Sequence, residues 1–214
     1  MSISRFFCPQ DHALGNALIN WTGRPVQDLL VYAESYRAAA CRLVHAHRDL
    51  KLNTPDHQVL PILYLYRHSL ELFLKSIVYY SAILSIPESE LVVALPRLWR
   101  EHSLLRLHAM ALPVLQATKY AAADAEYLGK NLLQMAAAID DVDAGSYSFR
   151  YPVTSAGASS LPSHFLTNIF AFSDAMESLL DDSLVFCRGL GQDARVASRQ
   201  MKLALHGLTS TNAA

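Results

Sequence analysis

The chain has 214 residues, of which 52% are hydrophobic and 17% charged, so a single domain can bury one sizeable core. Its formal net charge of −1 excludes a global positive field that attracts nucleic acid, so RNA binding requires a local basic patch. The low share of charged residues also favours a homodimer, in which a second copy covers part of the surface.

The N-terminal third of the sequence contains two predicted helices. Residues 1–24 show no sustained periodicity, and Pro25 suits the first turn of a helix. Apolar residues at helical spacing then predict a first helix over 26–49. Thr54 or Asp56 is expected to cap the second helix, which ends near Pro87.

The middle of the chain is predicted to contain two more helices. Residues 88–101 are expected to form a short connector with one helical turn. The apolar spacing predicts a third helix over 102–118, in which Pro113 would introduce a kink, and a fourth over 121–142.

The longest irregular segment covers residues 145–160 and precedes a late helix predicted over 161–189. A loop of this length in a compact domain is often functional. Tyr147, Phe149 and Tyr151 alternate along it, which allows one short extended piece.

Gly189 and Gly191 are expected to break the late helix, with a last helix over 193–206. Because no strand pattern extends beyond the loop, the predicted class is all-α, with four to five main helices and one long loop before the late helix. The predicted domains are an irregular segment (1–24), a helical bundle (25–190), and a C-terminal helix with a frayed tail (191–214).

The second helix is apolar on nearly every side, as a buried helix is, but four ionisable residues interrupt it. Residues three and four apart share a helix face, so Arg67 is expected to pair with Glu71, Glu71 with Lys75, and His68 to stack near Glu71. One interpretation is a salt-bridged ladder that fixes packing. The other is a binding or catalytic group, in which His68 transfers protons and Glu71 tunes it.

The loop places Arg150 between Phe149 and Tyr151, directly before Pro152. An arginine between aromatic residues on a loop suits recognition of a phosphate or a base. The alternative is a loop folded back on the bundle, whose aromatic rings plug the core while Arg150 bonds a helix end or Glu71.

A third group of residues lies around the start of the third helix. Arg97 precedes His102 by five positions, and His102 begins the helix. Arginine and histidine beside the free N–H groups of a helix start can bind phosphate. The alternative is a helix cap with solvated arginine side chains.

Several motifs of other protein classes are missing from the sequence. It contains no Glu-x-x-His pair of the di-iron type, no Cys-x-x-Cys, no P-loop and no dinucleotide fingerprint, so neither a metal nor a cofactor is expected. Cys8, Cys41 and Cys187 are far apart, which is typical of buried free thiols in a reducing compartment. No signal peptide is evident, and the ionisable residues of the second helix argue against a membrane span, so a cytoplasmic protein is expected.

Three segments in chain order, namely Tyr66–Lys75, Glu101–Leu107 and Phe149–Pro152, resemble the HEPN superfamily (higher eukaryotes and prokaryotes nucleotide-binding). The resemblance covers about 26–190. It implies an all-α bundle of four or five helices that dimerises. Many members are metal-independent ribonucleases of toxin–antitoxin, CRISPR and abortive-infection systems. Others bind RNA, nucleotides or a partner protein, so an antitoxin or another protein partner is also expected.

The resemblance implies roles for particular residues of this chain. Arg150 would contact phosphate, His68 or His102 would serve as acid or base, and Glu71 would orient the histidine. The remaining residues expected to bind RNA are Arg67, Lys75, Arg97 and Tyr151.

The spacing of catalytic members, an arginine followed four to six residues later by a histidine, fits Arg97 and His102, whereas His164 lies fourteen positions after Arg150. Two alternatives stay open. Either the loop brings His164 or His68 to Arg150, or the chain is a non-catalytic helical interaction module.

Overall fold

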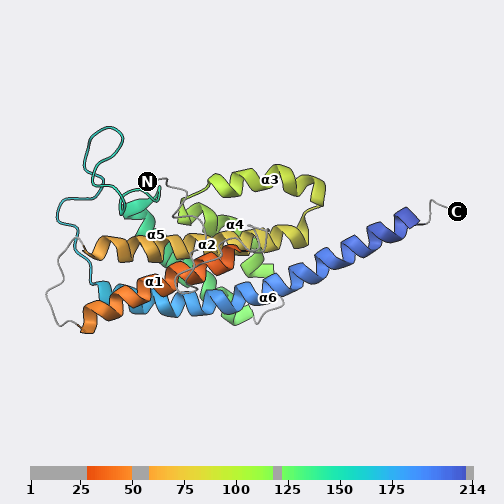
Figure 1. Ribbon diagram of the computed structural model, residues 1–214, viewed down its shortest axis with the longest axis horizontal. Helices are drawn as coiled ribbons and strands as arrows, with labels where there is room; N and C mark the ends of the chain where they lie inside the picture. Colours follow the sequence, from red (N-terminus) through yellow and green to blue (C-terminus); the bar gives the residue numbers. More distant parts are fainter. Residues whose placement is uncertain (1–27, 50–57, 118–121, 211–214) are drawn as a thin grey trace, which may run out of the picture.

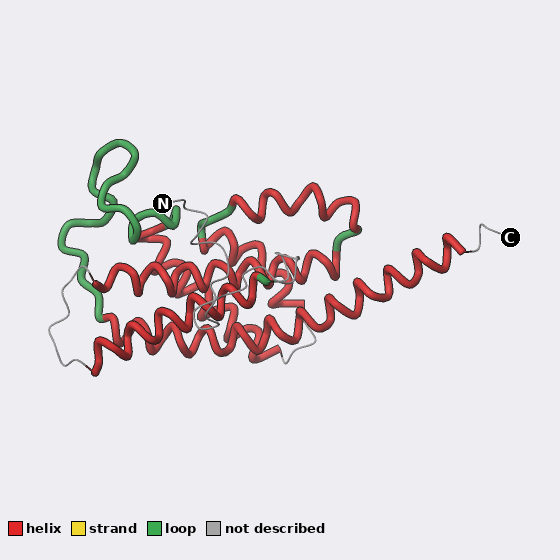
Figure 2. Tube along the Cα trace, viewed as in Figure 1, coloured by secondary structure: helices red, strands yellow, loops and turns green. Residues whose placement is uncertain are grey.

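The computed structural model describes residues 28–49, 58–117 and 122–210, and this part of the chain is an all-α bundle, as predicted (Figures 1 and 2). The described residues form six helices and no strand. The helices are α1 (Leu29–Asp49), α2 (Val59–Ser85), α3 (Glu88–Arg100), α4 (Leu104–Ala117), α5 (Ala122–Asp143) and α6 (Ile169–Ser210).

Helix α2 is the centre of the bundle. It packs against α1, α3, α4 and α6, while α5 packs mainly against α4 (Figure 1). Other helices surround most of α2, which explains why α2 is apolar on nearly every side. Its fully buried apolar side chains are Ile62, Tyr66, Leu70, Phe73, Leu74 and Ile77.

Helix α3 replaces the predicted connector, so the prediction for residues 88–101 was wrong. It runs for 13 residues, with Pro87 at its N-cap position and Pro96 inside it. A proline inside a helix removes one backbone hydrogen bond. The buried side chain of Leu98 and the packing of Trp99 against Tyr79 offset that loss through tertiary contacts, which the local sequence does not reveal.

Helix α6 differs from its prediction at both ends. It begins at Ile169, later than expected, because the side-chain oxygen of Asn168 accepts the N–H groups of Phe170 and Ala171 and caps the helix there. It also continues through Gly189 and Gly191 to Ser210, so the predicted break was wrong.

Gly191 allows close packing between two helices and does not break α6. A Cβ atom added at Gly191 would lie 3.1 Å from the ring of Tyr80 on α2. The missing side chain therefore lets α6 approach α2 closely at this point. The cost of a glycine inside a helix is offset by this contact with a buried ring.

The segment between α5 and α6 is a loop at one end of the bundle (Figure 2). Its extended pairing is an isolated antiparallel bridge between Val153 and Ser159. The short extended piece expected around Phe149 was misplaced, because the carbonyl of Tyr147 accepts the N–H groups of Arg150 and Tyr151 and closes a turn.

Some predictions fall on residues that the structure leaves undescribed. The candidate caps Thr54 and Asp56 lie there, as do Cys8 and the segment 1–24, and α2 has Gln58 at its N-cap position without a side-chain cap bond. Cys41 is half-buried and Cys187 buried, and both are free thiols. Among the described helices, none combines the length and the apolar character that a membrane span requires.

Two buried helical glycines should respond in opposite ways to alanine. At Gly129 an added Cβ meets Leu115 at 3.7 Å, an ordinary contact, so Gly129→Ala should stabilise the protein by about 0.5–1 kcal/mol through helix propensity. At Gly191 the same change should lower stability, because the buried Tyr80 ring must shift. Urea unfolding of both variants measures the difference, and a stabilised Gly191→Ala would contradict the packing role.

Candidate functional site

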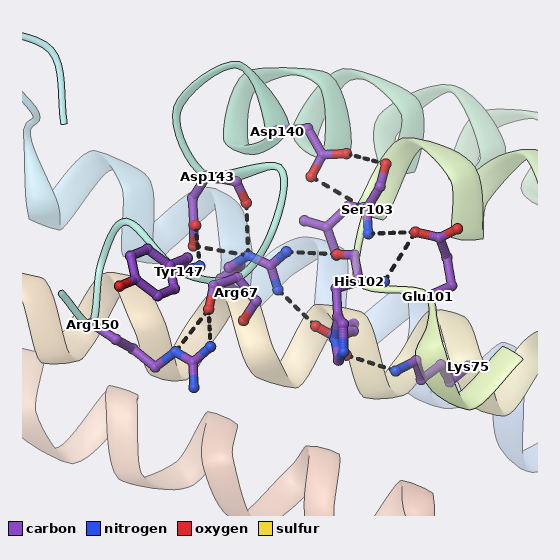
Figure 3. Close-up of polar contacts among 12 residues, drawn as sticks. Arg67, Lys75, Glu101, His102, Ser103, Asp140, Asp143, Tyr147 and Arg150 are labelled. Atoms are coloured by element: carbon purple, nitrogen blue, oxygen red, sulfur yellow. Dashed lines mark hydrogen bonds and ion pairs between the residues drawn. The ribbon is translucent and has the colours of Figure 1, made fainter. Parts of the chain in front are cut away.

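Arg67 is the centre of a buried polar network that joins three parts of the chain (Figure 3). Its side chain is fully buried on α2. Its Nη1 donates to Glu71 Oε2 at 2.7 Å, so the predicted ion pair is confirmed. Its Nη2 donates to the carbonyl of His102 at 2.6 Å, and its Nε lies 3.1 Å from Asp143 Oδ2. One planar guanidinium therefore holds α2, the segment before α4 and the end of α5 together.

Glu71 forms the second half of the network. Its Oε1 accepts a hydrogen bond from Lys75 Nζ at 2.8 Å, which confirms the other predicted pair, and lies 3.0 Å from Nδ1 of His102. Burial alone would raise the pKa of Glu71, but the hydrogen bonds and charges of Lys75 and Arg67 lower it below its ordinary value. Glu71 is therefore ionised near neutral pH.

His102 is the exposed member of this network. Its backbone is fixed by Arg67, and about half of its side-chain surface is open, at 52%. Because a carboxylate only accepts hydrogen bonds, Nδ1 of His102 carries the proton that faces Glu71. The other ring nitrogen, Nε2, is then the acceptor of the neutral ring. A histidine oriented by a carboxylate in this way can act as a general acid or base.

The start of α4 is capped by the protein's own groups. Asp140 accepts the N–H groups of Leu104 and Leu105 and the hydroxyl of Ser103, whose oxygen in turn accepts the N–H of Arg106. Glu101 accepts the N–H groups of His102 and Ser103. The capping interpretation is confirmed, and the N–H groups expected to bind phosphate are occupied.

Arg97 is exposed in the last turn of α3, and no contact joins it to His102 in the part of the chain that the structure describes. The two residues with the literal spacing of the resemblance are therefore held by different elements. Arg97 is solvated, while His102 belongs to the buried network.

The loop after α5 folds back on the bundle, which was one of the two alternatives given for it. Phe149 is buried and packs near Phe165, with ring centres 6.4 Å apart. Arg150 donates from Nε to the carbonyl of Ser146 at 2.7 Å, and its Nη2 donates to the same carbonyl. The acceptor is thus the turn after α5 and not Glu71.

Aromatic rings surround the Arg150 guanidinium. Its central carbon lies 5.4 Å from the ring centres of both Tyr64 and Tyr151. His68 stacks on Tyr64 at 5.7 Å and meets Tyr36 edge-on at 4.5 Å. The result is a continuous row of contacts along one side of α2, which we call the aromatic row: Tyr36, His68, Tyr64, Arg150, Tyr151 and Tyr147.

His68 is neutral in this setting. Burial lowers its pKa below the ordinary value of 6.5, and the positive charges of Arg67, Lys75 and Arg150 lower it further, against the opposing charge of Glu71. The ring in direct contact with Glu71 is that of His102, whereas His68 was expected to stack near it. His68 packs between Tyr36 and Tyr64 instead.

The candidate residues follow one face of α2 in a fixed order. Tyr64, His68 and Glu71 are spaced four and three residues apart, so they share a face. Arg150 lies over Tyr64 and His102 lies against Glu71. Seven residues of helix separate these two points, which places them about 10 Å apart along the axis.

Three of the predicted site residues do not lie on this outer face of α2. Arg67 and Lys75, expected to bind RNA, are buried in ion pairs, so they form the framework and not its outer surface. His164 is exposed, with a positive φ of 59°, and no contact joins it to Arg150 among the described residues.

Sequence reasoning missed Asp140, Asp143, Ser146 and Tyr64. The run from Asp140 to Asp143 was interpreted only as a helix end. The signal was a pair of acidic residues three positions apart on an Ala-rich helix. A carboxylate that is buried needs hydrogen-bonding or charged partners, so the pair could have indicated such partners. For Tyr64 the signal was its position four residues before His68.

In the described residues, no group of three histidine, cysteine or acidic side chains is placed to hold a metal ion. No model of a known protein family matches the chain, and no characterised protein or solved structure is significantly similar to it.

Glu71→Ala should lower the free energy of unfolding by about 3–5 kcal/mol, because Arg67 and Lys75 lose a buried partner. Urea unfolding measures the loss. Glu34→Ala, which removes an exposed ion pair with Arg188, is the matched control and should cost less than about 1 kcal/mol. An equal effect of both changes would contradict the buried framework.

Glu71 should also make stability depend on pH in the acid range. Its folded pKa lies below the ordinary 4.5, so its contribution is present above about pH 4.5 and disappears as the pH falls through the folded pKa. Melting temperatures measured from pH 6 to pH 3 should therefore fall more steeply for the native chain than for Glu71→Gln. Parallel curves would show that the ionised Glu71 carboxylate does not contribute this stability.

Proposed function

We propose that this protein binds single-stranded RNA along the face of α2 that carries the aromatic row, as its resemblance to the HEPN superfamily implies. The observation that carries the proposal is the setting of Arg150. This cation lies at the surface among aromatic rings, and no carboxylate of the described residues pairs with it. An uncompensated guanidinium with aromatic neighbours suits an RNA phosphate.

The pairing of charges beneath this face supports the same choice of ligand. Glu71 and Asp143 pair with the buried cations Arg67 and Lys75, and the buried Asp140 is bonded to Ser103 and to N–H groups of α4. These buried carboxylates are thus engaged by groups other than Arg150. Tyr151 beside it is 48% exposed and offers an aromatic edge for a splayed base.

We propose further that the bound RNA is cleaved without a metal ion. His102, oriented by Glu71, would take the proton of a ribose 2′-OH at Nε2. The 2′-oxygen then forms a bond to phosphorus, and the bond from phosphorus to the 5′-oxygen breaks. The 5′-oxygen leaves with a proton from water, and His102 then returns its proton to the solvent. Arg150 would stabilise the charge of the phosphorane, and the products carry a 2′,3′-cyclic phosphate and a 5′-hydroxyl.

The positions of their contacts on α2 favour a dimer for this reaction. Tyr64, which Arg150 contacts, and Glu71, which His102 contacts, lie about 10 Å apart along the helix axis. Two copies that face each other would bring Arg150 of one to His102 of the other. The resemblance implies that the two protomers of a dimer juxtapose their Arg–His pairs, in the setting of a cytoplasmic defence or toxin system.

A second candidate is a non-catalytic helical module that dimerises and binds a protein partner such as an antitoxin. The extent of the buried network favours it, because a network that ties three elements together explains Glu71 without chemistry. Size-exclusion chromatography with light scattering gives the oligomeric state that both candidates share. RNA binding separates them.

The test is a titration of labelled single-stranded RNA in EDTA. Arg150→Ala should weaken binding about tenfold for every base sequence and reduce the salt slope of log Kd by about 0.7, the share of one phosphate on a single strand. His102→Gln should leave binding intact and stop cleavage. Arg188→Ala removes an exposed arginine that pairs with Glu34 on the α1–α6 side and should change neither.

Two results would contradict the proposal. Absence of RNA binding by the native dimer would favour the interaction module. Cleavage that persists in both the Arg150 and the His102 variants would exclude this face as the catalytic site.

A further inference from the structure

We infer that Asp143 is a positioning residue that sets the direction of the Arg150 guanidinium through the turn after α5. The inference rests on the proposed function, because it identifies how the phosphate contact of that function is prepared. Asp143 is buried, being 1% exposed, and its contact with the aromatic row is a hydrogen bond from the backbone N–H of Tyr147. It acts on Arg150 through the turn and the Ser146 carbonyl.

The turn is built around the Asp143 side chain (Figure 3). Its Oδ1 accepts the N–H groups of Tyr147 at 2.5 Å and Ser148 at 2.7 Å. Its backbone carbonyl accepts the N–H of Ser146 at 3.2 Å. Ser146 itself is buried and held at a φ of 58°, a conformation that non-glycine residues rarely adopt. The surrounding bonds therefore fix the direction of the Ser146 carbonyl.

That carbonyl is the acceptor for Arg150. Nε and Nη2 both donate to it, so one edge of the guanidinium is fixed, and Nη1 keeps no partner among the described residues. Tyr64 and Tyr151 lie against the guanidinium at 5.4 Å. An arginine held in this way loses little conformational entropy when it binds a phosphate, which strengthens the contact.

The other carboxylate oxygen of Asp143 ties the turn to α2. Oδ2 lies 3.1 Å from Nε of Arg67, three residues beyond Tyr64 on the same helix. The Ser146 carbonyl that orients Arg150 and the Tyr64 ring that packs against Arg150 are thus both anchored to α2. A change at Asp143 should reach the RNA contact even though Asp143 never meets the RNA.

Asp140 provides a matched control on the same helix. It lies one turn earlier, is also buried, and also accepts two backbone N–H groups. Its bonds cap α4, and none of them reaches the turn that holds Arg150. Asp140→Asn and Asp143→Asn therefore each alter one buried carboxylate of α5 but differ in their link to Arg150, and Asp143→Asn also removes the charge beside Arg67.

The first readout is RNA affinity in a double-mutant cycle, with the native chain and Arg150→Ala as backgrounds. Asp143→Asn should weaken binding of a labelled single-stranded oligonucleotide about tenfold in the native background, as loss of the single phosphate contact does. It should add nothing in the Arg150→Ala background, and Asp140→Asn should have little effect in either. Additive losses, or an unchanged affinity of Asp143→Asn, would overturn the inference.

The second readout needs no RNA. In the native protein, NMR of the arginine Nε–H groups should show a signal protected from exchange, assigned to Arg150 because it vanishes in Arg150→Ala. Asp143→Asn, where folded, should lose that protection, and Asp140→Asn should keep it. An unprotected Arg150 signal in the native protein would overturn the positioning role. A protected signal without RNA binding would leave the positioning intact and reject the proposed function alone.

Discussion

The ion pair and hydrogen bonds of Arg67 are the constraint on which the rest of the site depends. A fully buried guanidinium is costly to desolvate and is tolerated only when its donors are satisfied. Here Glu71 and the backbone carbonyls of Asp143 and His102 accept its hydrogen bonds, the Asp143 carboxylate lies beside Nε, and these partners come from α2, α5 and the segment before α4. Because one rigid planar group must meet all of them, the positions of these elements relative to α2 are fixed together.

Everything exposed on this face of α2 follows from that buried arrangement. Glu71, held by Arg67 and Lys75, orients His102, while Asp143, held by Arg67, closes the turn whose carbonyl orients Arg150. The buried carboxylates Glu71 and Asp143 pair with Arg67 and Lys75, whereas Arg150 donates to a backbone carbonyl. The structural and the functional interpretations of the polar stripe are therefore compatible, since the buried members form the framework and the exposed members are the proposed RNA contacts.

The sequence predicted local interactions well and those between distant segments poorly. The all-α class and the pairs of Arg67 and Lys75 with Glu71 depend on spacing along one helix, which is visible in the sequence. The continuous α6 was missed because Gly191 faces Tyr80 of another helix, and the contact of His102 with Glu71 was missed because it joins segments 31 residues apart. Asp143 was missed for the same reason, as its partner Arg67 lies 76 residues earlier in the chain.

The most direct test of this account is the Arg67→Lys variant, which keeps the charge but replaces a planar fork with a single ammonium group. A lysine cannot reach Glu71, Asp143 and the His102 carbonyl at once, so buried acceptors are left unsatisfied. The measurement is urea unfolding together with NMR of the His102 and Arg150 side chains. The account predicts a loss of at least about 2 kcal/mol and altered signals from both side chains. Native stability with both signals unchanged would contradict it.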